Sequence, residues 1–100
     1  MFWFNSDKPE VRSNTTNPYK VIEEHTATFV CILTAANPNT GIMWKWIKTD
    51  SPNTALYSGP SSNYTISNVQ RDKRGSYSCT ATNSVGTSEA VTIDVDVQCK

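Results

Sequence analysis

The sequence has little of what catalysis, nucleic-acid binding or membrane insertion requires. It contains a single histidine, His25, and its nine basic residues are balanced by nine acidic ones. One histidine cannot form a Ser/His/Asp arrangement, and a chain without net charge has no bulk field that attracts nucleic acid or an anionic membrane. No apolar run approaches the roughly 20 residues of a membrane span, and no glycine-rich loop is present to cradle a phosphate. These absences predict a non-catalytic protein without a cofactor, a nucleic-acid partner or direct membrane insertion.

The charged side chains do not gather into an ion site or a basic patch. Asp94 and Asp96 are more simply the solvated side of a strand than a calcium site, because no loop supplies oxygen ligands at the needed density. Arg71 and its basic neighbours at 73 and 74 are interrupted by Asp72 and have no aromatic residue among them. A solvated corner therefore explains them better than a heparin or nucleic-acid patch.

Short alternating segments predict a single all-β domain within these 100 residues. Inward-facing side chains recur at every second position in five segments: Ala27, Phe29, Cys31 and Leu33; Ile42, Trp44 and Trp46; Tyr64 and Ile66; Tyr77, Cys79 and Ala81; Val91, Ile93, Val95 and Val97. Turn residues at 37–41, 51–53, 58–60 and 83–86 separate these segments, and 54–57 is a candidate edge strand. In the 83–86 turn we expect Gly86 to supply a positive φ. Strands at this spacing without a helical period indicate a β-sandwich.

Five residues that lie far apart in the chain make the pattern more specific. Cys31 and Cys79 are 48 positions apart, Trp44 follows the first cysteine by 13, and Gly75 and Tyr77 precede the second. Together with residues 64–86 as a whole, this pattern resembles the immunoglobulin superfamily, and within it the I-set and C2-type domains. Only 20 positions separate Trp44 from the tyrosine at 64, which is too short for the extra edge strands of antigen-receptor variable domains.

The resemblance implies an immunoglobulin-like β-sandwich of two antiparallel sheets with Greek-key connections. It implies a Cys31–Cys79 disulfide, which leaves neither thiol for zinc and stabilises the fold by about 4 kcal/mol. Trp44 is expected to pack on the sulfurs. The Tyr77 hydroxyl is expected to form a hydrogen bond to the backbone at the corner between the segments at 64–66 and 77–81. The predicted core residues are Trp44, Tyr77, Phe29, Leu33 and Ile66.

Three positions depart from the family pattern. Glu24 stands where the family has a turn glycine, so we expect that turn to differ. Lys73 stands where the family often has an acidic residue, which puts the usual charge pair in doubt. Trp46 follows Trp44 on the same face and is expected either to cap the lower core or to shield an edge.

The predicted domain covers residues 9–97, with an N-terminal tail or linker at 1–8 and a C-terminal tail at 98–100. We expect the chain to be one domain of a larger protein, with adjacent domains as partners. Cys99 has no obvious partner within the chain. It is a thiol that is free or paired in a neighbouring domain, or it forms an interchain disulfide.

Two sequons, at Asn14 and Asn63, match the acceptor rule for N-linked glycans. They arise either by chance or as used sites. Together with the predicted disulfide, they favour an extracellular location, either at the cell surface or as a secreted protein.

The side chains that alternate with the core form a candidate protein-binding face. Its members are Met43, Lys45, Ile47, Ser78, Thr80, Thr82, Thr92 and Asp94. Relatives commonly use this sheet for homophilic or heterophilic adhesion. The alternative is that the face is simply a half-exposed sheet surface that binds no partner. The resemblance implies an extracellular recognition module of a cell-adhesion or immune receptor-type protein. The alternative is a structural spacer in a multi-domain array, either extracellular or of the muscle-filament type.

Overall fold

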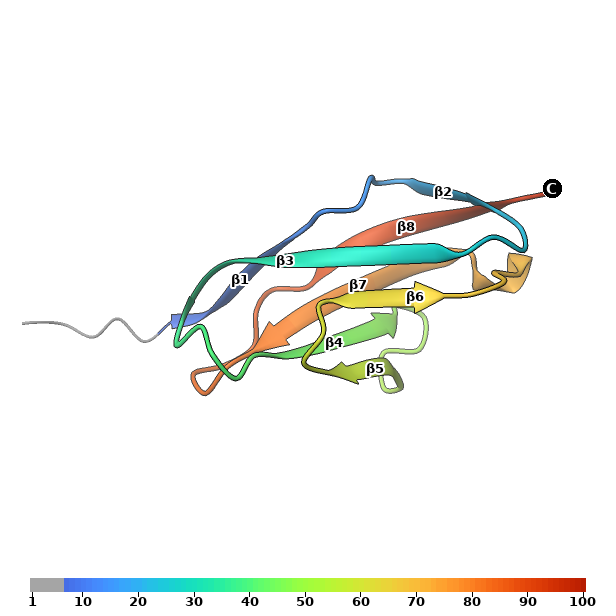
Figure 1. Cartoon of the computed structure of the whole chain (residues 1–100). Helices are drawn as coiled ribbons and strands as arrows, with labels where there is room; N and C mark the ends of the chain where they lie inside the picture. The colour runs from blue at the N-terminus through green and yellow to red at the C-terminus, as the bar shows by residue number, and fades with distance from the viewer. Residues whose placement is uncertain (1–6) are drawn as a thin grey trace, which may run out of the picture.

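The computed structural model describes residues 7–100, and these residues are built almost entirely from strands (Figure 1). The strands are β1 (Asp7–Ser13), β2 (Tyr19–Ile22), β3 (Ala27–Asn37), β4 (Met43–Lys48), β5 (Ala55–Gly59), β6 (Asn63–Ile66), β7 (Gly75–Thr82) and β8 (Val91–Gln98). A single 3₁₀ turn, η1 (Arg71–Lys73), lies between β6 and β7. The predicted tail or linker at residues 1–8 lies mostly outside the described residues.

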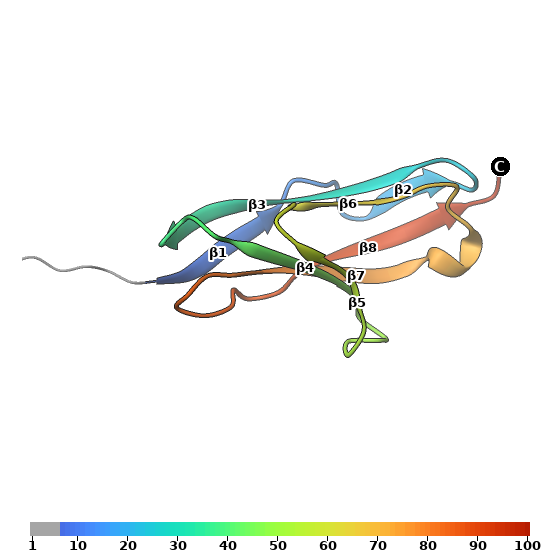
Figure 2. The ribbon, with the colours of Figure 1, turned by 60° about the horizontal axis from the view of Figure 1, so that its bottom comes forward.

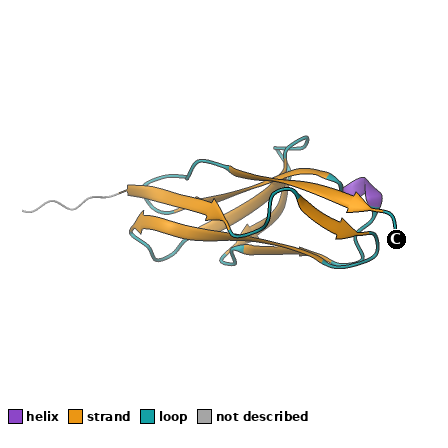
Figure 3. Ribbon diagram, turned by 90° about the horizontal axis from the view of Figure 1, so that it is seen from above, coloured by secondary structure: helices purple, strands orange, loops and turns teal. Residues whose placement is uncertain are grey.

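The strands form two layers, as the prediction of a β-sandwich requires (Figures 2 and 3). One sheet has the order β1-β3-β6 and the other has the order β2-β8-β7-β4-β5. All pairs are antiparallel except β2 with β8, which is parallel from Tyr19 opposite Val95 to Ile22 opposite Gln98. The chain keeps its direction as it passes from β1 to β2, and β8 runs the same way (Figure 1). The prediction of purely antiparallel sheets is therefore wrong at this one edge.

Aromatic rings and the disulfide fill the space between the two layers. Phe29 on β3 is fully buried, with its ring centroid 5.1 Å from that of Tyr77 and 5.9 Å from that of Trp46. The predicted bridge joins Cys31 on β3 to Cys79 on β7 across a Cα–Cα distance of 6.8 Å. Rings of this size each bury on the order of 200 Å² of surface, so they dominate the core of so small a domain.

The predicted core members occupy two levels of burial. Phe29, Trp44 and Tyr77 belong to the buried cluster. Leu33 and Ile66 are only half-buried and pack against its margin. The inward alternation of the sequence therefore identified the correct side of each strand, but not how far the core extends along it.

The role expected for Trp44 belongs by position to Trp46. Trp46 lies opposite Cys79 in the β4–β7 ladder and is fully buried, whereas Trp44 lies opposite Ala81 and retains 6% exposure. The Trp46 ring also stacks on Tyr64 of the other sheet, with centroids 6.3 Å apart. The expectation that Trp46 caps or shields an edge is wrong, because the register of β4 places it at the centre of the sandwich.

Two turns differ from what their sequences suggested. Glu24 adopts a φ of +74°, the left-handed conformation that favours glycine, although it carries a side chain. The backbone N–H of Glu24 donates to the carbonyl oxygen of Val69 at 2.7 Å, which ties the turn to the segment that follows β6. Gly86, in contrast, is not among the positive-φ residues, and the 83–86 turn depends on a side chain instead.

The described chain enters and leaves the sandwich at opposite ends. β1 begins at one end of the long axis, and the C-terminus follows β8 at the other (Figures 1 and 3). Copies joined end to end would therefore extend along this axis rather than fold back on one another.

Candidate recognition face

The residues predicted for protein binding gather on one side of three neighbouring strands. Met43, Lys45 and Ile47 on β4 lie opposite positions 82, 80 and 78 of β7. Positions 78 and 76 of β7 lie in turn opposite Thr92 and Asp94 on β8. The register therefore arranges the predicted residues in adjoining rows on the outer surface of the five-stranded sheet, which we call the β4–β7–β8 face.

The side chains on the two outer strands of this face, β4 and β8, are mostly exposed, whereas Ser78 on the middle strand, β7, is buried. Met43 is 48% exposed, and Lys45, Thr92 and Asp94 are exposed as well. Ser78 is only 4% exposed and contributes little accessible surface, unlike the expectation from its strand position. A shallow hollow of about 340 Å³ lies on the face, lined by Lys45, Ile47, Ser78, Thr80, Thr82, Thr87 and Ala90.

Hydroxyl groups fix the polar side of the face. The Ser76 Oγ donates to Asp94 Oδ1 at 2.5 Å, which holds the carboxylate in place. The hydroxyls of Ser78 and Thr92 lie 3.0 Å apart and form a hydrogen bond across β7 and β8. With one cationic and one anionic residue, the face offers both signs of charge beside apolar surface, as protein interfaces do.

One exposed apolar residue beside the face was missed by the sequence reasoning. Leu56 on β5 is 39% exposed and lies in a bulge, since Trp46 pairs with Tyr57 but Ile47 pairs with Ala55. The only signal in the sequence was a short segment between two turn clusters. A bulge adds a residue without a ladder partner, so alternation could not show which way Leu56 points.

At the corner between β6 and β7, the predicted tyrosine contact is present. The Tyr77 hydroxyl donates to the carbonyl oxygen of Lys73. Burial raises the pKa of Tyr77 to about 12, and negative charge at Tyr64, Asp50 and Asp72 adds to the effect. The raised pKa therefore keeps Tyr77 in its neutral, donating form into the alkaline range.

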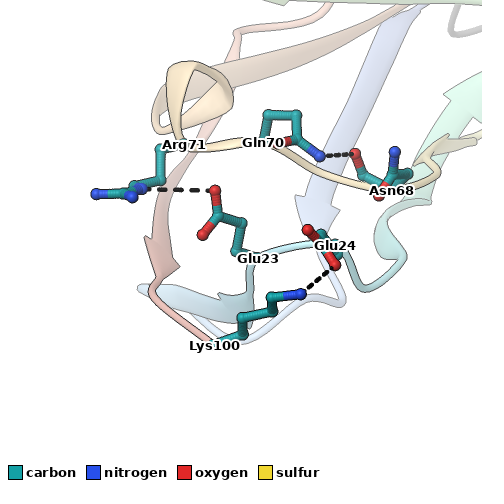
Figure 4. Close-up of polar contacts among 6 residues, drawn as sticks. All are labelled: Glu23, Glu24, Asn68, Gln70, Arg71 and Lys100. Carbon is teal, nitrogen blue, oxygen red and sulfur yellow. Dashed lines mark hydrogen bonds and ion pairs between the residues drawn. The ribbon is translucent and has the colours of Figure 1, made fainter.

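At the end of the sandwich that holds the C-terminus, four charged residues form two ion pairs, in which only the Glu23 side chain is largely covered (Figure 4). Arg71 Nε lies 3.5 Å from Glu23 Oε2, and Lys100 Nζ lies 2.8 Å from Glu24 Oε1. The guanidinium and ammonium side chains are each 63% exposed, so such pairs contribute little to stability. Arg71 thus has an acidic partner on the turn after β2, which fits the predicted solvated corner better than a basic patch.

The remaining predicted positions are all accessible. Asn14 and Asn63 are exposed, and Cys99 is an exposed free thiol. His25 is exposed in the turn between β2 and β3. Within residues 7–100, no group of three or more histidine, cysteine or acidic side chains is placed to hold a metal ion. The same residues include no helix long and apolar enough to cross a membrane.

A family model described as an immunoglobulin domain matches residues 8–83, and the chain therefore belongs to the immunoglobulin domain family. A search of the curated proteins finds no match. Among solved structures, the N-terminal four Ig domains of Dscam1 isoform 6.9 match with a TM-score of 0.69 and 18% identity, over 89% of this chain and 20% of that chain. The full ectodomain (Ig1–Ig3) of mouse nectin-like molecule 4 matches with a TM-score of 0.69 and 19% identity, over 92% of this chain and 31% of that chain. The chain thus spans a third or less of these matched structures, and identities this low establish the fold alone.

Proposed function

We propose that this chain is an extracellular, non-catalytic immunoglobulin-like module that recognises a protein partner, in a cell-adhesion or immune receptor-type protein. The β4–β7–β8 face is the surface through which it binds, either to a copy of itself or to another protein. The observation that carries the proposal is the position of Met43 and Ile47, two aliphatic side chains beside Lys45 on the outer side of a sheet. Apolar anchors next to a charge, with hydroxyls around them, form the mixture found in modest protein interfaces.

The extracellular location is supported by the disulfide and by one of the comparisons. The Cys31–Cys79 bridge closes 48 residues of sequence, and such bonds persist in oxidising surroundings. One of the matched structures is described as a full ectodomain, although its low identity allows only an analogy with this chain.

A structural spacer in a multi-domain array is the second candidate. The observation that favours it is the entry and exit of the described chain at opposite ends of the sandwich (Figure 1). Intact-mass measurement on protein from a secreting host separates its muscle-filament form from the extracellular proposal. Reduced cysteines at 31 and 79 in protein that carries no glycan would favour the filament form.

A double substitution tests the face directly. Met43→Asp with Ile47→Asp places two carboxylates where the apolar anchors stand, which desolvation and repulsion make unfavourable in an interface. We expect self-association, measured by sedimentation at rising concentration, to fall to background. We expect the same of cell binding by a multimeric form of the domain.

Ile22→Asp is the matched control for this experiment. Ile22 is an exposed aliphatic residue, at 42%, on β2, which is separated from β4 by two strands. Its substitution should leave binding unchanged. If the double variant binds as well as the wild type, the β4–β7–β8 face is not the recognition surface.

A further inference from the structure

The two sequons lie in one row across the three-stranded sheet, although 49 positions separate them in the sequence. The backbone N–H of Asn14 donates to the carbonyl oxygen of Val30 at 2.8 Å, which continues the β1–β3 ladder by one residue. On the other side of β3, Val30 pairs with Asn63 on β6. Val30 is therefore flanked by both acceptor asparagines, and two strand spacings place their backbones roughly 10 Å apart.

Both asparagines belong to the outer side of this sheet. Phe29 and Cys31 are buried in the core, so Val30 between them faces outward. Its ladder partners share that orientation, since residues directly opposite each other project to the same side of a sheet. Asn14 and Asn63 are both exposed, in agreement with this register.

The side-chain amides are free to react, while their neighbours are held in place. Neither amide nitrogen donates a hydrogen bond to any residue in the described part of the chain; Asn63 Oδ1 only accepts one from Ser62, at 3.3 Å. In the first sequon, Thr15 Oγ1 accepts from the Val30 N–H at 2.7 Å. That contact fixes the middle residue to β3 and leaves Asn14 and Thr16 exposed on either side of it.

We propose that both asparagines carry N-linked glycans, which together cover the outer side of the β1-β3-β6 sheet. β1 and β6 are the two edge strands of that sheet, so one glycan stands at each edge. An unprotected edge strand can pair with a strand of another chain. Glycans at these two positions block such pairing at β1 and at β6. Protein contact is thereby directed to the other sheet, which carries the β4–β7–β8 face.

The modification is a group transfer that requires a lipid-pyrophosphate-linked oligosaccharide and the secretory transferase that uses it. A bond forms between Asn Nδ2 and the anomeric carbon of the sugar. The bond from that carbon to the phosphate oxygen breaks. The lipid pyrophosphate and one amide proton leave, and nothing is oxidised or reduced.

Intact-mass measurement of protein secreted by a glycosylating host tests whether the sites are used. We expect two glycans on the wild type, one on Asn14→Gln, one on Asn63→Gln and none on the double variant. Thr16→Ala and Thr65→Ala, which keep the asparagines but remove the hydroxyl of each sequon, should each lose one glycan as well. Asn53→Gln, at an exposed asparagine outside any sequon, should keep both. A secreted wild-type protein with fewer than two glycans overturns the proposal.

A labelling experiment tests whether the glycans cover the sheet. In a Cys99→Ser background, Thr28→Cys places a thiol on the outer side of β3, two residues from Val30. Asp96→Cys places one on the outer side of β8, in the other sheet. A polyethylene-glycol maleimide should label the first thiol slowly until a glycosidase removes the glycans, and the second equally fast before and after. Equal rates at Thr28→Cys before and after glycan removal overturn the proposal.

This inference shares only the secretory route with the proposed function. Oxidised, secreted protein without glycans would contradict the glycan proposal and leave the β4–β7–β8 face untouched. Glycosylated protein whose binding survives Met43→Asp with Ile47→Asp would contradict the recognition face alone.

Discussion

At the scale of single residues, Tyr77 illustrates how one side chain serves both packing and polarity. Its ring contacts Phe29 in the core, and its hydroxyl reaches the Lys73 carbonyl at the edge. Because the ring is almost wholly buried, ionisation would place a charge where solvent cannot stabilise it. The hydroxyl is useful only as long as it keeps its proton.

Alkaline pH should therefore weaken the fold through Tyr77. The pKa of the group is raised from its ordinary value of 10.0 to about 12 in the folded domain. The folded state thus holds the proton more tightly than the unfolded state. The resulting stability is fully present below pH 10 and is lost as the pH rises towards 12, by about 2–3 kcal/mol.

Urea unfolding of the wild type and of Tyr77→Phe across that pH range provides the measurement. At pH 7 the variant should be about 1 kcal/mol less stable, because it lacks the hydrogen bond to Lys73. The difference should shrink and reverse in sign above pH 10. A difference that stays constant with pH would contradict the assignment.

Single residues also show where sequence reasoning ends. The Tyr77 contact followed from the family pattern and is confirmed. The positive φ of Glu24 could not be read from the sequence, because the turn is held by backbone bonds to distant residues such as Val69. The β4–β7 register decides whether Trp44 or Trp46 lies opposite Cys79. A shift of two residues would change that partner and keep both tryptophans on the same side of the sheet, so alternation alone could not decide between them.

At the scale of elements, Asn83 ties the turn between β7 and β8 to two other segments. Its Oδ1 accepts from the backbone N–H groups of Val85 and Gly86, at 2.9 and 3.1 Å. Its Nδ2 donates to the carbonyl oxygens of Asp7 on β1 and of Pro38, at 2.8 and 3.1 Å. The side chain is 7% exposed, so no solvent would replace these bonds fully.

Asn83→Ala should consequently destabilise the domain by roughly 2–4 kcal/mol, because buried donors and acceptors lose their partners. Ser84→Ala, at the exposed neighbouring position, should change the free energy of unfolding by less than about 0.5 kcal/mol. Thermal and urea unfolding of both variants make the comparison. Equal stabilities for the two variants would show that the turn does not depend on Asn83.

The elements themselves were largely predictable from alternation, which gave the inward residues of β3, β4, β7 and β8 correctly. The parallel pairing of β2 with β8 was not, because periodicity reports which side a residue faces and not which strand lies beside it. Leu56 remained hidden for a related reason, since its bulge interrupts the ladder between β4 and β5.

At the scale of the whole molecule, the two sheets differ in what they present outward. The three-stranded sheet carries both sequons in one row, whereas the five-stranded sheet carries Met43, Ile47 and the hollow beside them. The disulfide joins the sheets across the core, and the chain-entropy model assigns it about 4 kcal/mol of stabilisation. The sequence predicted which residues lie together on the β4–β7–β8 face. It could not show that the two sequons are neighbours, because only the ladders through β3 bring them together.

The central claim is that protein recognition occurs on the β4–β7–β8 face, and a glycan placed on that face tests it most directly. Thr80→Asn creates a sequon with Thr82 in the lining of the hollow and keeps Met43, Lys45 and Ile47, and Thr80→Gln is the same surface without an acceptor. Both variants are secreted from one host and made multimeric, and their binding to cells or to the domain itself is measured. We expect the glycosylated variant to lose the binding that the matched variant retains. Equal binding by the two variants, with the new glycan verified by mass, would contradict the account.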